Sequence, residues 1–192
     1  MLLPALCLAA PSTILVFGDS LSAGYGIARE QAWPSLLATR LKDSGSAYTV
    51  VNGSVSGETT AGGLSRLPAA LQQHKPQIVV IELGANDGLR GLPVAAMRAN
   101  LASMIDASRK AGAHVLLVGM RLPPNYGQAY TDQFAASYAL LAKEKKTALV
   151  PFFFDGFAGN PDAFQADHLH PTAASQPLML ELIWKPLKPL LH

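Results

Sequence analysis

Short apolar runs alternate with longer amphipathic stretches along most of the chain. Five runs are almost continuously apolar, at residues 13–17, 48–52, 78–83, 114–118 and 148–153. Strands that are this uniformly apolar are covered on both faces, which is typical of a parallel sheet between helices. The pattern therefore predicts five buried parallel strands.

The stretches between these runs carry a helical period. One helix face is marked by residues at i, i+4, i+7, i+8 and i+11, namely Met97, Leu101, Met104, Ile105 and Ser108. Pro93 suits the first turn of that helix, and Gly112 ends it. We expect further helices over residues 33–41, 60–74, 130–145 and 173–184. Strands that alternate with such helices predict one doubly wound α/β domain.

In a doubly wound sheet, ligands bind at the carboxyl ends of the strands, where the strand order reverses. The segments that follow the strands are therefore where chemistry is expected. They comprise residues 18–22, 52–58, 84–88, 121–127 and 167–171.

Ser20 follows the first strand at a strand-to-helix junction. A serine hydroxyl is a poor nucleophile unless a histidine removes its proton and a third group orients that histidine. Asp167 and His170, three residues apart in one loop, supply a carboxylate and an imidazole. Two alternatives stay open from spacing alone: His168 as the base, and an N-cap role for Ser20.

Two further turns supply hydrogen-bond donors for an oxyanion site. Gly57 presents a backbone N–H with no side chain in the way. Asn86 offers a side-chain amide at the same end of the sheet, although Asn-Asp-Gly is also an ordinary turn sequence. The convergence of these segments at one end of the sheet favours a single site.

Composition narrows the class of protein. The 192 residues suit one domain, and 49% hydrophobic residues with 15% charged residues exclude intrinsic disorder. A net charge of +2 does not indicate a nucleic-acid binder, and there is no apolar run long enough to span a membrane. Arg29 stands where a dinucleotide fingerprint needs its third glycine, and no ligand spacing predicts a metal. We therefore expect no cofactor.

The first residues form a separate segment. Residues 1–10, MLLPALCLAA, are apolar and end in small residues, as a signal peptide does before its cleavage site, but they lack a basic beginning. We predict that residues 1–11 are a signal peptide, complete or truncated at its start, and that residues 12–192 are the domain. A frayed apolar N-terminus is the alternative. Such a signal peptide would direct the domain to the periplasm or the exterior, and its cleavage would remove Cys7, the only cysteine.

The segments around the candidate residues resemble the conserved blocks of the SGNH (GDSL) hydrolases. Residues 18–26, GDSLSAGYG, resemble the first block, and Gly57 resembles the glycine of the second. Residues 84–87, GAND, and 167–171, DHLHP, resemble the third and fourth blocks, in the family's order. Residues 51–59, 86–91 and 122–127 are similar to the multifunctional bacterial thioesterase/arylesterase/lysophospholipase subgroup.

The resemblance implies a flavodoxin-like three-layer α/β/α sandwich with a five-stranded parallel sheet. It implies Ser20 as the nucleophile, His170 as the general base and Asp167 as the carboxylate that orients it. The implied oxyanion hole consists of the Ser20 N–H, the Gly57 N–H and the Asn86 side chain. His170 is preferred to His168 because it occupies the fourth position of the DxxH block.

We therefore expect a monomeric serine esterase acting on carboxylic esters and thioesters, such as aryl esters, acyl thioesters and lysophospholipid-type esters. An apolar crevice wall is expected from Leu89, Leu122, Pro123, Pro124 and Tyr126. The Pro-Pro-Asn-Tyr segment is alternatively a rigid turn. Arg90 and Arg121 would attract an anionic group or serve as surface charges. The rival functions are a carbohydrate O-acetylesterase with the same machinery and a non-catalytic flavodoxin-like binding module.

Overall fold

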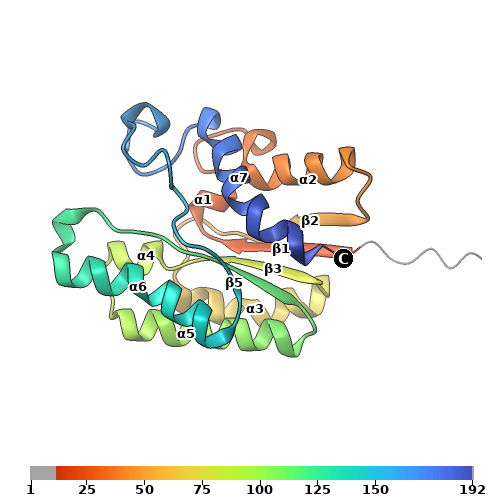
Figure 1. The fold of residues 1–192 in the computed structure, drawn as a ribbon, viewed down its shortest axis with the longest axis horizontal. Helices are drawn as coiled ribbons and strands as arrows, with labels where there is room; N and C mark the ends of the chain where they lie inside the picture. Colours follow the sequence, from red (N-terminus) through yellow and green to blue (C-terminus); the bar gives the residue numbers. More distant parts are fainter. Residues whose placement is uncertain (1–11, 192) are drawn as a thin grey trace, which may run out of the picture.

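A five-stranded parallel sheet with helices on both faces makes up the structure, a computed structural model that describes residues 12–191 (Figure 1). The strands are β1 (Ser12–Gly18), β2 (Tyr48–Asn52), β3 (Ile78–Glu82), β4 (His114–Val118) and β5 (Ala148–Val150). Their order is β2-β1-β3-β4-β5, and all neighbours are parallel. The predicted α/β fold is confirmed. The predicted signal peptide lies outside the described residues.

Helices cover the sheet in two layers. Helices α2 and α7 lie on one face, and α3, α5 and α6 lie on the other (Figure 1). The helices are α1 (Ser20–Ala23), α2 (Trp33–Asp43), α3 (Thr60–His74), α4 (Ala85–Leu89), α5 (Val94–Lys110), α6 (Gln128–Lys145) and α7 (Gln176–Leu187). Short 3₁₀ turns occur at Arg29–Gln31, Pro124–Tyr126, Pro161–Ala163, Ala173–Ser175 and Lys188–Leu190.

The two central strands form the core. All side chains of residues 14–17 and 78–81 are fully buried, as the continuous apolar runs predict. Each buried aliphatic or aromatic side chain contributes about 1.5–3 kcal/mol relative to an exposed one. The strands therefore form a rigid support for the loops at their carboxyl ends.

The reversal of strand order lies beside β1. Strand β1 pairs with β2 on one side and with β3 on the other, so the chain crosses over β1 between them. The segments that follow these three strands consequently meet at one end of the sheet. They carry Ser20, Gly57 and Asn86.

Strand β5 is shorter than predicted, because it ends at Val150 rather than at residue 153. Pro151 follows directly, and a proline has no N–H to donate to the sheet. The Phe153 N–H then donates to the Gly119 carbonyl at 3.0 Å, which starts a loop away from the sheet. Phe152 and Phe154 are thereby placed beside the site described next.

Candidate active site

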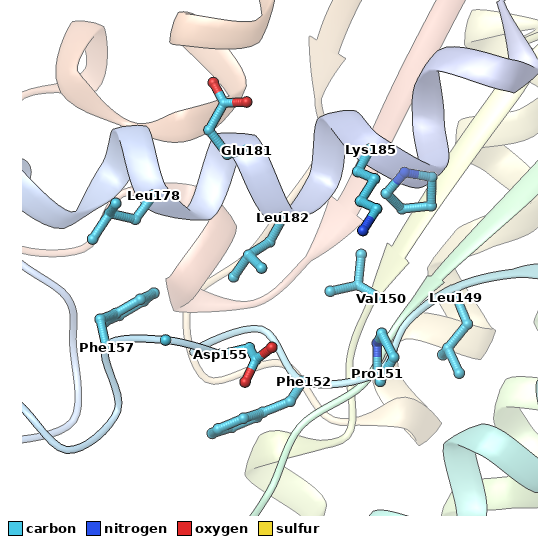
Figure 2. Close-up of a pocket in the computed structure, with 12 residues that line it drawn as sticks. Leu149, Val150, Pro151, Phe152, Asp155, Phe157, Leu178, Glu181, Leu182 and Lys185 are labelled. Carbon is cyan, nitrogen blue, oxygen red and sulfur yellow. The ribbon is translucent and has the colours of Figure 1, made fainter.

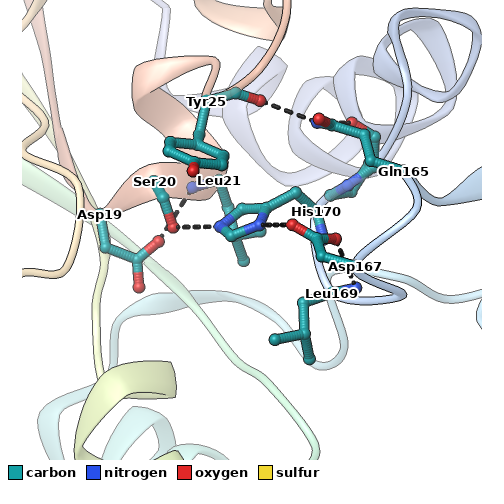
Figure 3. Close-up of polar contacts among 9 residues, drawn as sticks. Asp19, Ser20, Leu21, Tyr25, Gln165, Asp167, Leu169 and His170 are labelled. Carbon is teal, nitrogen blue, oxygen red and sulfur yellow. Dashed lines mark hydrogen bonds and ion pairs between the residues drawn. The ribbon is translucent and has the colours of Figure 1, made fainter.

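Ser20, His170 and Asp167 form one hydrogen-bonded line at the carboxyl end of β1 (Figure 3). His170 Nε2 lies 2.9 Å from Ser20 Oγ, and His170 Nδ1 lies 2.7 Å from Asp167 Oδ2. A carboxylate beside Nδ1 favours the tautomer with its proton on Nδ1. Nε2 is then the acceptor for the Ser20 hydroxyl, which is the arrangement that a serine nucleophile needs.

The N-cap of α1 is Asp19 rather than Ser20. The Asp19 side chain accepts a hydrogen bond from the Leu21 N–H at 3.0 Å, while Ser20 is the first residue of the helix. The alternative capping role for Ser20 is therefore taken by its neighbour. The Ser20 hydroxyl faces the imidazole instead.

Backbone groups of its own loop hydrogen-bond the Asp167 carboxylate. Asp167 Oδ1 accepts hydrogen bonds from the backbone N–H groups of Leu169 at 2.9 Å and His170 at 3.0 Å. The pKa of Asp167 is lowered to about 2, mainly by the hydrogen bond from the His170 backbone N–H. Asp167 is therefore a carboxylate at all ordinary pH values.

Of the two candidate histidines, His170 makes the contacts to both Asp167 and Ser20, and His168 lies on the cavity wall in a left-handed backbone conformation (φ 57°).

Asn86 lies on the short helix α4 rather than in the plain turn that its sequence also allowed. Its Nδ2 donates to Asp19 Oδ2 at 2.9 Å and to the Glu58 carbonyl at 3.0 Å. Gly57, just before Glu58, has a φ of 77°, and its carbonyl accepts a hydrogen bond from Arg90 at 2.9 Å. The two predicted oxyanion donors thus belong to segments that contact each other.

Asp87, the residue after Asn86, fixes the helix that follows the Gly57 loop. Its carboxylate is buried and accepts hydrogen bonds from the backbone N–H of Thr60 at 2.8 Å and from the Thr60 hydroxyl at 2.5 Å. Thr60 is the first residue of α3. Helix α4 and the start of α3 are therefore tied together directly behind the site.

A buried pair of carboxyl groups lies next to Ser20. Asp19 is 1% exposed and Glu82 is 3% exposed, and Glu82 Oε2 accepts hydrogen bonds from the Ser22 hydroxyl at 2.7 Å and the Asp19 N–H at 3.3 Å. Burial raises the pKa of Asp19 to about 6. Burial and the nearby Asp19 charge raise the pKa of Glu82 well above its ordinary value. The pair therefore keeps a proton at pH values where isolated carboxyl groups are ionised.

Ser20, Asn86 and His170 line a cavity of about 580 Å³. Its walls are mostly apolar and come from several loops: Leu21, Ala85, Leu89, Met120, Leu122, Pro123, Pro124, Phe152, Phe154, Phe164 and Leu169. The predicted Leu89, Leu122 and Pro123 are among them. Tyr126 is not among them, although its hydroxyl donates to the carbonyl of the wall residue Leu89 at 3.2 Å. Gly57 also lies outside the lining.

The two candidate arginines have different surroundings. Arg90 is turned toward the Gly57 carbonyl, so it fixes the loop rather than facing the cavity. Arg121 lines the cavity, and its guanidinium lies over the Phe152 ring, 4.7 Å from the centroid. Arg121 is therefore the better placed of the two to meet an anionic group on a bound molecule.

A second cavity, of about 690 Å³, lies between β5 and α7 (Figure 2). Its polar lining residues are Asp155, Glu181 and Lys185, and the other described lining residues are mainly apolar. Among the residues that the structure describes, this lining holds no hydroxyl nucleophile and no imidazole. Phe152 borders both cavities.

Sequence reasoning assigned no role to several residues of the site. Glu82 gave a signal, because it is the one charged residue in the third apolar run. Phe152 falls within the expected strand at residues 148–153, and Phe154 lies just beyond it. Neither Tyr25 nor Gln165 gave a separate signal, although the Tyr25 ring centroid lies 4.5 Å from that of His170.

Within residues 12–191, no group of three His, Cys, Asp or Glu could hold a metal ion, and no helix is long and apolar enough to cross a membrane.

The chain is similar in sequence and in fold to known proteins. The GDSL-like lipase/acylhydrolase family matches residues 16–176. Esterase TesA of Pseudomonas aeruginosa is 54% identical, covering 95% of this chain and 91% of its own length. Thioesterase 1/protease 1/lysophospholipase L1 of Escherichia coli K12 is 43% identical, covering 96% and 87% respectively. A crystal structure of TesA has a TM-score of 0.91 at 54% identity, covering 94% of this chain and 100% of that one.

The family match includes Ser20, Gly57, Asn86, Asp167 and His170. The relatives are aligned with this chain over nearly its whole length, so the likeness is not confined to the four short blocks. This chain belongs to the GDSL-like lipase/acylhydrolase family.

Proposed function

We propose that this chain is a serine esterase that hydrolyses carboxylic esters and thioesters through an acyl-Ser20 intermediate. The observation that carries the proposal is the line from Asp167 through His170 to Ser20, with contacts of 2.7 Å and 2.9 Å, on the wall of an apolar cavity. The names of the relatives, which include an esterase and a thioesterase, support the same reaction class.

Acylation begins when Ser20 Oγ attacks the carbonyl carbon of the substrate. His170 Nε2 takes the hydroxyl proton, and the Asp167 carboxylate stabilises the imidazolium that forms. The tetrahedral intermediate then collapses, the bond to the leaving oxygen or sulfur breaks, and His170 returns the proton to that atom. The alcohol or thiol departs, leaving an ester between the acyl group and Ser20.

Water completes the cycle. His170 removes a proton from water, the hydroxide attacks the acyl-Ser20 carbonyl, and the collapse of the second intermediate returns the proton to Ser20 Oγ. The carboxylic acid is released. The same base serves both halves because its carboxylate partner remains ionised, with a pKa of about 2.

The negative oxygen of each intermediate needs hydrogen-bond donors that are fixed in advance. The proposed donors are the N–H groups of Ser20 and Gly57 and the Asn86 side-chain amide. In this structure Asn86 Nδ2 donates to Asp19 and to the Glu58 carbonyl, so one of these bonds is exchanged for the oxyanion. We expect the Glu58 bond to be exchanged, since a carboxylate holds a donor more strongly than a neutral carbonyl does.

The cavity favours an acyl chain over a sugar. Its walls are largely aliphatic and aromatic, whereas a carbohydrate O-acetylesterase needs polar groups that bind sugar hydroxyls. Arg121 on the rim would attract the anionic part of a coenzyme A thioester or a lysophospholipid. In a cell, the proposed signal peptide at residues 1–11 would direct the enzyme to the periplasm or the exterior.

The decisive experiment replaces the nucleophile. We expect Ser20→Ala to lower hydrolysis of p-nitrophenyl butyrate by about 10³-fold or more, while Ser103→Ala, on the exposed side of α5, keeps wild-type activity. An alkyl phosphonate should label the wild type at Ser20, as mass spectrometry of the peptides would show. Activity of Ser20→Ala within about tenfold of the wild type would refute the mechanism.

A further inference from the structure

The side chain of Gln165 connects the two segments that hold the reacting groups (Figure 3). Gln165 Nε2 donates to the Tyr25 carbonyl at 2.8 Å and to the Pro171 carbonyl at 3.1 Å. Tyr25 lies just beyond α1, which begins with Ser20, and Pro171 directly follows His170. One amide nitrogen therefore joins the nucleophile segment to the base segment across 140 positions of the chain.

Other contacts also hold this junction together. The Tyr25 and His170 rings lie with centroids 4.5 Å apart. The Gln165 N–H donates to the His170 carbonyl at 2.8 Å, so the base loop folds back on Gln165. Gly26 lies under the amide: a Cβ atom there would be 2.1 Å from Gln165 Oε1, and its φ is 75°. The Gln165 amide thus occupies the space that a side chain at position 26 would need.

The Asp167–His170 contact does not depend on this junction. Asp167 bonds to the backbone N–H groups of Leu169 and His170 and to the imidazole, all within its own loop. A displaced loop would therefore keep its carboxylate–imidazole pair. The 2.9 Å distance from His170 Nε2 to Ser20 Oγ would change instead. Unlike the Asp167 bonds, this contact joins the loop to the nucleophile segment.

We propose that Gln165 is a positioning residue that sets the distance between Ser20 Oγ and His170 Nε2 by donating both amide hydrogens across the junction. The inference rests on the proposed roles of Ser20 and His170. An amide is required, since both partners are carbonyl oxygens and a carboxylate of the same shape would face them with acceptors only.

The test compares Gln165→Glu and Gln165→Ala with Gln73→Glu, which makes the same chemical change on an exposed position of α3. We expect kcat, per active site titrated with phosphonate, to fall about 10- to 100-fold in both Gln165 variants, as a misplaced base does. KM for p-nitrophenyl butyrate should stay at the wild-type value in both variants. Gln73→Glu should match the wild type throughout.

A second variant approaches the same contact from the other side. Gly26→Ala should lower kcat in the wild-type background and lower it less when Gln165 is already alanine, because the clash with the amide is then gone. Equal losses in the two backgrounds would contradict the proposal.

Two outcomes distinguish a failure of the positioning role from a failure of the catalytic mechanism. Suppose that Ser20→Ala is inactive. If Gln165→Glu then has the same kcat as Gln73→Glu, the positioning role is wrong and the catalytic mechanism stands. The same conclusion follows if Gln165→Glu lowers only the titratable fraction of sites and the melting temperature, with kcat per site unchanged. If Ser20→Ala keeps its activity, the catalytic mechanism itself is wrong.

Discussion

The Asp19 carboxylate accepts a hydrogen bond from the Asn86 side-chain amide at 2.9 Å, joining segments that are 67 positions apart. The residue before the proposed nucleophile therefore holds a proposed oxyanion donor. The carboxylate is itself fixed by the Leu21 N–H, and it lies beside the buried Glu82. Nucleophile and donor are thus oriented by one buried polar cluster between β1 and β3.

Removing the Asn86 amide should slow catalysis more than binding. We expect Asn86→Ala to lower kcat by about 10²–10³-fold with little change in KM, because in its proposed role the amide stabilises charge that develops only in the transition state. Steady-state kinetics with p-nitrophenyl butyrate measures this split. A fall in kcat of less than about tenfold would contradict an oxyanion role.

The Asp19 carboxyl should give the protein a recognisable pH dependence of stability. Its pKa is about 6 in the folded protein, compared with an ordinary value of 3.8, so the folded state binds more protons between these values. The free energy of unfolding therefore falls as pH rises from about 4 to about 6, with a contribution of about 3 kcal/mol.

Urea unfolding at pH 4 and pH 7 measures this contribution. In Asp19→Asn we expect the difference in unfolding free energy between the two pH values to shrink by about 2–3 kcal/mol. Asp43→Asn, an exposed change at the end of α2, should leave that difference unaltered. The raised pKa would be disproved if Asp19→Asn followed the wild-type dependence.

The apolar wall should set the acyl-chain preference. Leu122 is 9% exposed and lines the cavity. We expect Leu122→Trp to lower kcat/KM for p-nitrophenyl octanoate about tenfold more than for the acetate, since the larger ring fills space that a long chain needs. Leu140→Trp is the matched control, because Leu140 on α6 is 55% exposed. Equal losses on both esters would place Leu122 outside the chain path.

Gly84 should tolerate no side chain. Its φ is 117°, and a Cβ atom would be 2.2 Å from the hydroxyl of the buried Tyr138. We expect Gly84→Ala to cost about 2–4 kcal/mol of unfolding free energy. Gly91→Ala, with a φ of 66° and nothing within 4 Å of the added Cβ, carries backbone strain alone and should cost about 1–2 kcal/mol. Urea denaturation compares the two, and equal costs would mean that the Tyr138 contact is unimportant.

The fold was largely predictable because burial on both faces leaves continuous apolar runs in the strands. Strand β5 was overextended, since the three phenylalanines after Pro151 have the same apolar pattern whether they pair in a sheet or line a cavity. The short helix α4 was missed because residues 85–89, ANDGL, have little helix propensity. Its conformation depends on the buried Asp87 bonds to Thr60.

Part of the site could also be predicted, because residues at the ends of neighbouring parallel strands must meet. Ser20 and Asn86 follow strands β1 and β3, which pair directly. The contacts of Gln165 could not be predicted in this way. A glutamine in a polar loop carries no periodic signal, and its two acceptors become neighbours only in the folded chain.

Ser20 and His170 are 150 positions apart, on the first and the last of the segments that build the site. With the roles proposed for Ser20 and His170, a folding chain has no activated nucleophile until the loop after β5 has docked onto α1. The onset of ester hydrolysis after dilution from urea therefore reports when this contact forms. Burial of Trp33, whose N–H donates to the Gln176 side chain at the start of α7, instead reports packing that needs no catalytic contact.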